Sequence, residues 1–139
     1  MYRSFLVATA ALTLATSAFA QDRTPAPANA EAYIVSPANG DIVTNPITVV
    51  FGLKGIGVAP AGTEAENTGH HHLLINTGLP ALGEPIPADE NHIHFGGGQT
   101  QSEIELEPGE HKLQLLLGDL NHIPHDEPVA SEVITIVVE

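Results

Sequence analysis

The stretch ITVVFGLK (47–54) decides the class of fold. Its apolar side chains recur at every second position from Ile47 to Leu53, which is the period of a β-strand with one face on a core. Further short runs of β-branched residues or leucine follow it. Gly or Pro interrupts the sequence so often after residue 31 that no substantial helix fits there. The sequence therefore predicts an all-β domain.

Seven strands are expected between residues 32 and 139 by the same criteria. Their ranges are Ala32–Ser36, Ile47–Lys54, His70–Asn76, His92–Phe95, Gln99–Leu106, His111–Leu117 and Ser131–Val138. Seven short strands separated by turn signals are typical of an immunoglobulin-like β-sandwich. The segment SPANGDIVTNP (36–46) before an alternating strand resembles the opening of such domains. We therefore expect a single sandwich of about seven strands.

The first twenty residues have the layout of a secretory signal peptide. Arg3 precedes an apolar run over residues 5–14, and the segment ends in Ala18-Phe19-Ala20, a small-x-small site for signal peptidase. The apolar run is too short to cross a bilayer. We therefore expect cleavage after Ala20, a flexible Pro/Ala-rich lead-in over residues 21–31 and one domain over residues 32–139. The expected location is the periplasm or the outside of the cell.

The residue counts restrict what the chain can bind. It has no cysteine, so neither a disulfide nor a cysteine-linked lipid can hold it. All 17 acidic residues follow Ala20, together with only three basic residues, so residues 21–139 have a net charge of −14 with histidine neutral. Such a surface repels nucleic acid and anionic lipid and attracts cations. We expect no membrane contact after signal cleavage, and the sequence identifies neither a protein partner nor an oligomeric state.

Seven of the eight histidines fall in three clusters, at residues 70–72, 92–94 and 122–125. Residues i and i+2 of a strand point to the same face about 6.6 Å apart, so each of the first two clusters could place two imidazoles on one ion. In an immunoglobulin-like sandwich the loops beside all three clusters meet at one end. We therefore expect one metal site at that end. Its candidate ligands are His70, His72, His92, His94, His122 and His125.

Imidazole restricts the choice of metal. It is a good ligand for Cu²⁺ and Zn²⁺ and a poor one for Ca²⁺ or Mg²⁺. A thiolate or thioether Cu(I) site is excluded because no Cys or Met follows residue 20. Nitrogen sites bind copper(II) most tightly among the divalent ions, so copper(II) is expected first and zinc second. Carboxylates at Glu90, Asp119 and Asp126 could complete the site or orient its rings, whereas His71 and His111 are expected to be structural.

At these motifs the chain resembles a bacterial secreted family, the domain of unknown function 4399. The resemblance rests on GHHHLLIN (69–76), HFGGGQT (94–100) and LLLGD (115–119) with NHIPH (121–125). It runs from about Ser36 to the end of the chain. The resemblance implies one coherent domain and a site shared at these histidines, and it implies no particular activity.

Three functions fit these patterns. The histidine clusters favour a periplasmic metal-binding protein for storage, delivery or tolerance of copper(II) or zinc. A metal-dependent enzyme would need an open coordination position and a base such as Glu90 or Asp126. No nucleophile motif supports it, so the sequence favours a protein without catalytic activity. A metal-free immunoglobulin-like interaction module is the third possibility, although two tyrosines and no tryptophan offer few aromatic anchors for a partner.

Overall fold

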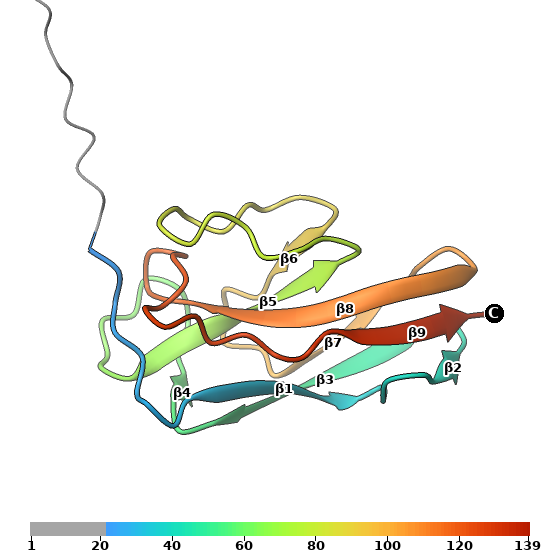
Figure 1. Ribbon diagram of the computed structural model, residues 1–139, viewed down its shortest axis with the longest axis horizontal. Helices are drawn as coiled ribbons and strands as arrows, with labels where there is room; N and C mark the ends of the chain where they lie inside the picture. The colour runs from blue at the N-terminus through green and yellow to red at the C-terminus, as the bar shows by residue number, and fades with distance from the viewer. Residues whose placement is uncertain (1–21) are drawn as a thin grey trace, which may run out of the picture.

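The computed structural model describes residues 22–139, which form two β-sheets packed face to face (Figure 1). Its strands are β1 (Glu31–Ser36), β2 (Ile42–Val43), β3 (Ile47–Lys54), β4 (Gly57–Val58), β5 (Thr68–Ile75), β6 (His92–His94), β7 (Gln101–Ile104), β8 (Gly109–Gly118) and β9 (Ile134–Val138). Within residues 22–139 there is no helix of the length and apolarity that a membrane span needs. The predicted signal peptide lies outside the described residues.

The order of the strands confirms the predicted β-sandwich. One sheet has the order β1-β3-β7, and the other has the order β2-β9-β8-β5-β4 with β6 paired to β5. All seven predicted ranges overlap a strand, and the range 47–54 matches β3 at both ends. Strands β2 and β4 are absent from the prediction. Each is two residues long, too short to show a period of two; β2 pairs in parallel with β9 at the far end of the chain, and β4 pairs in parallel with β5, eleven residues further on.

The fourth predicted strand has a different place from the one expected. In the constant-type immunoglobulin arrangement the fourth strand belongs to the sheet of the first, second and fifth strands. Here β6 instead extends the other sheet, where it pairs with β5 in antiparallel register. This brings residues 92–94 alongside residues 72–74.

The main core lies between the two sheets. Strand β3 buries its apolar alternate residues there, as the period of two predicts, and β8 buries Leu113, Leu115 and Leu117. Strand β5 contributes Leu73 and Ile75. These inward residues fix which side chains of β5 point outward, because successive residues of a strand point to opposite faces.

The outer face of β5 and β8 is covered as well. The connection between β5 and β6, residues 76–91, lies over this face, on the side away from β1 and β3 (Figure 1). Ile86 of the connection packs with Leu74 and Leu116 in a second, smaller apolar cluster. Strand β5 is therefore buried on both faces, and the outward side chains of His70 and His72 lie beneath this cover rather than in solvent.

His71 points the other way, into the main core. Its ring packs against Phe51 with 5.1 Å between ring centroids, and it is fully buried. Neither ring nitrogen finds a hydrogen-bond partner within residues 22–139. A buried polar group without a partner costs about 1–3 kcal/mol.

We predict that His71→Leu increases the free energy of unfolding by about 1 kcal/mol, since it removes that cost at similar side-chain volume. Urea denaturation at pH 7.5 measures the change. The same substitution at His111 is the matched control, because its ring nitrogens bond to Asn76 and to the carbonyl of Glu107 and nothing is gained by removing them. A His71→Leu protein less stable than the wild type would contradict the prediction.

Candidate metal centre

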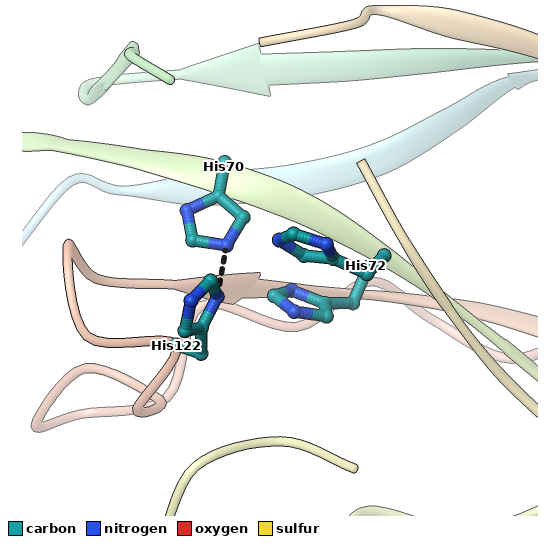
Figure 2. Close-up of side chains that lie close together, drawn as sticks. His70, His72 and His122 are labelled. Atoms are coloured by element: carbon teal, nitrogen blue, oxygen red, sulfur yellow. Dashed lines mark hydrogen bonds between the residues drawn. The ribbon is translucent and has the colours of Figure 1, made fainter. Parts of the chain in front are cut away.

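Four histidines meet on the outer face of the larger sheet. His70 and His72 come from β5, His94 from β6 and His122 from the loop after β8. One nitrogen from each ring can be chosen so that all four lie within 4.8 Å of one another. Figure 2 shows the rings of His70, His72 and His122 gathered in one place, although 52 residues separate the first from the last.

The distances suit a single ion. Ring centroids within the group are 4.8 to 6.3 Å apart. Nε2 of His70 lies 3.1 Å from Nδ1 of His122. Two nitrogens that bind one ion at about 2.0–2.1 Å lie at most about 4.2 Å apart. The limit of 4.8 Å exceeds this by about 0.6 Å, which small ring rotations can close.

Strand register places three of the four rings. His70 and His72 share a face of β5, and the Cα of His94 is the antiparallel partner of that of His72. Glycines leave room for the rings. A Cβ at Gly118 would lie 2.8 Å from Cε1 of His72, and one at Gly96 would collide with the ring of His94. The two glycines therefore belong to the site although they offer no ligand.

The fourth ring depends on a tight turn. His122 has φ of 66°, in the left-handed region that side-chain-bearing residues seldom occupy. The buried carboxylate of Asp119 holds this turn. Its Oδ1 accepts hydrogen bonds from the amides of Asn121 (2.8 Å) and Ile123 (3.0 Å), and its Oδ2 accepts one from the hydroxyl of Thr24 (2.7 Å). Asp119 thus positions His122 through the backbone.

The segment before β1 lies against the same loop (Figure 1). The amide of Ala26 donates to the carbonyl of Asp126 (2.8 Å), whose own amide donates to the carbonyl of Thr24 (2.9 Å). Arg23 donates to the carbonyls of Pro124 and His125 and pairs with the carboxylate of Asp126. Two of these bonds join backbone groups alone and leave no pattern in the sequence, and the other three depend on the side chain of Arg23. The Pro/Ala-rich composition of the expected lead-in therefore gives little sign of them.

With this geometry established, the comparison with known families is informative. The family model DUF4399, a domain of unknown function, matches residues 49–139. The chain belongs to this family. No curated protein and no solved structure matches it. The matched range includes all four gathered histidines, and membership assigns no activity to the DUF4399 domain.

Two of the six predicted ligands lie outside the group. His92 points to the same face of β6 as His94, but its strand partner is Leu74, and its Nδ1 lies 2.7 Å from a carboxylate oxygen of Asp89. His125 is buried, with its Nε2 3.1 Å from the carbonyl of Thr68. The DUF4399 domain therefore gathers four of the six predicted ligands.

The place of the site also differs from the expected one. The sequence predicts a site among loop tips at one end of the sandwich. The four rings do lie toward one end, but on the outer face of the sheet, because β6 pairs with β5 and sets His94 beside His72. Of the predicted carboxylates, Asp119 supports the turn and Asp126 pairs with Arg23. Glu90 is exposed and is not part of the group.

Burial favours the neutral form of three of the four rings of the DUF4399 domain, those of His70, His72 and His94. Desolvation lowers the pKa of His70 to about 4, and the charges of His122 and His94 add to this effect. Desolvation, followed by the charge of His70, lowers the pKa of His72 to about 3. It also lowers the pKa of His94. Neutral imidazole is the form that binds metal, so these rings are ready to do so at neutral pH.

The same burial makes the metal-free domain sensitive to acid. His71, whose pKa desolvation lowers to about 4, isolates the effect because no charged neighbour contributes. A histidine with a lower pKa in the folded state than its ordinary 6.5 stabilises the fold above pH 6.5, and this stability is lost as the pH falls toward 4. For His71 the loss between pH 7.5 and pH 5 is about 2 kcal/mol.

We predict that the free energy of unfolding, measured with urea in the presence of EDTA, falls between pH 7.5 and pH 5. Ordinary carboxylates titrate mainly below this range, so histidines account for most of the fall. The His71→Leu variant should lose about 2 kcal/mol less than the wild type over the same range. Equal losses in the two proteins would mean that His71 takes up its proton without cost in the folded state.

Proposed function

We propose that this DUF4399 protein binds one divalent transition-metal ion, copper(II) or zinc, through His70, His72, His94 and His122. The observation that carries the proposal is the meeting of four imidazoles from three separate segments with their nitrogens within 4.8 Å. No purely structural need brings four such rings together at this distance.

The hydrogen bonding of the rings supports the same conclusion. Buried polar side chains in proteins nearly always have partners. Here Nδ1 of His70 and Nδ1 of His72 are buried and unpartnered within the described range. The bond between His70 and His122 is the one hydrogen bond found among the four rings of that range. A metal ion would be the electrophile for the ring nitrogens that face the group. Nδ1 of His70 points away from His122 (Figure 2) and would stay outside such a site.

The chemistry of the donors favours copper(II), then zinc. Four neutral nitrogens without a carboxylate select borderline transition metals over Ca²⁺ and Mg²⁺. The strongly acidic chain raises the local concentration of cations. His94 is the exposed member of the group, and His70 and His72 are buried, so the ion would enter from the side of His94.

The signal-peptide pattern of residues 1–20 supports an exported protein. The proposed role is therefore storage, delivery or tolerance of copper(II) or zinc in the periplasm or outside the cell. Such a role needs only the metal site.

The first test compares two histidines of β6 that share a face. We predict that the metal-free protein binds about one Cu²⁺ or Zn²⁺ per chain at pH 7.5, and that His94→Ala weakens binding at least tenfold, about 1.4 kcal/mol. His92→Ala should change the affinity less than twofold. His94 is exposed, so its truncation leaves no buried cavity. Isothermal titration with a competing chelator measures both affinities.

Two results would refute the proposal. One is the absence of stoichiometric binding of either metal to the wild-type protein. The other is an equal loss of affinity in the His92 and His94 variants, because it would mean that the group of four is not the ligand set. Far-UV circular dichroism confirms that each variant keeps its fold.

A second test uses the space that glycine leaves for His72. We predict that Gly118→Ala weakens metal binding at least tenfold, since the new Cβ would lie 2.8 Å from Cε1 and 3.3 Å from Nδ1 of that ring. Gly78→Ala is the matched control, because a Cβ there meets nothing within 4 Å. Unchanged affinity in a folded Gly118→Ala protein would show that the position of His72 does not matter for binding.

A further inference from the structure

The four rings are not sealed on all sides. A cavity of about 200 Å³ lies beside them, lined by His72, His94 and His122 and by Pro85, Ile86 and Ala88 of the connection between β5 and β6. His70 does not line it. An ion held by the four nitrogens would therefore have the cavity on one side and His70 toward the other.

The wall of the cavity is fixed to the site. The amide of Ile86 donates a hydrogen bond of 2.7 Å to the carbonyl of His122, so the wall and the fourth ring are directly connected. The side chain of Ile86 is 5% exposed and packs with Leu74 and Leu116. The cavity is therefore a part of the packed structure and not a gap under a loosely held loop.

From this arrangement we infer that the metal ion carries an exchangeable fifth ligand in the cavity. The inference rests on the proposed metal site. Four protein ligands usually close a zinc site, whereas copper(II) prefers a tetragonal arrangement, in which four nitrogens leave a further position for an exchangeable ligand. Here the chain offers four nitrogens with an accessible cavity beside them. Within the described residues no fifth histidine or carboxylate belongs to the group.

The lining determines the class of ligand. Pro85, Ile86 and Ala88 give an apolar wall, and no Lys or Arg is among the described residues that line the cavity. The exposed acidic residues Glu84, Asp89 and Glu90 flank this wall in the chain. Their negative charge opposes the attraction between an anion and the dication that the four neutral rings would hold. The ligand is therefore a small neutral nitrogen donor with an apolar body, of the kind that imidazole represents.

The size of the cavity agrees with such a ligand. A water molecule occupies about 30 Å³ in the liquid, so a space of about 200 Å³ holds several waters or one small ring. A neutral ring would place its nitrogen toward the metal and its carbon atoms against Pro85 and Ile86.

The experiment follows the visible absorption and electron paramagnetic resonance of the copper(II)-loaded full chain during titration with imidazole, and separately with azide as an anion. We expect imidazole to change both spectra saturably with one equivalent per copper, at a concentration at least tenfold lower than azide. Gel filtration after each titration shows that copper stays on the protein.

Two variants of the connection test the location. Ala88→Phe should fill the cavity and weaken imidazole binding at least tenfold while copper affinity stays within twofold. Ala81→Phe is the matched control, at an exposed position of the same connection that does not line the cavity, and it should behave as the wild type. Imidazole that leaves the spectra unchanged, or binds Ala88→Phe as tightly as the wild type, would overturn the inference alone. A failure of the wild-type chain to bind either copper or zinc before any imidazole is added would overturn the proposed function with it.

Discussion

Burial of strand β5 on both faces is the constraint on which the rest of the structure depends. Side chains of a strand alternate between its two faces, so a doubly covered strand must satisfy two different interiors. The inward face carries Leu73 and Ile75 into the main core. The outward face carries His70 and His72, which are both buried, and His72 lies beside Pro85 and Ile86 of the connection that leads to β6. Three consecutive histidines therefore lie in two separate environments, and His71 belongs to the core rather than to the site.

This arrangement lowers the stability of the fold and holds the four rings in place in advance. Imidazoles without hydrogen-bond partners are costly to bury, and desolvation holds their pKa values well below the ordinary one. The leucine-rich core of β8 and the apolar cover over Leu74 and Leu116 offset this cost. In return, the rings are held neutral and close together before any ion arrives. An ion that binds there would displace few protons and would order little of the chain.

Local pattern predicted the fold and the shared face of two of the four gathered histidines. The period of two fixed the strands, and the i, i+2 spacing set His70 and His72 on one face of β5. The same spacing could not separate His92 from His94, because the choice depends on which of them lies opposite His72 in the sheet. The path of the loop after β8 likewise decides between its two histidines. His122 joins the group, whereas His125 lies against the carbonyl of Thr68. Strand pairing and the placement of a loop against other segments are long-range properties, and a single sequence carries little information on them.

The connection between β5 and β6 covers the site, and its covering role is not predictable from local pattern. Its Pro and Gly residues give it no periodicity, so the sequence predicts only a long loop. Yet Ile86 of this segment buries the outer face, and its amide holds the carbonyl of His122. The contacts that hide Leu74 and Leu116 from water thus also fix the wall beside the four rings. Because one segment does both, the chain cannot open the space beside the four rings widely without exposing part of its own core.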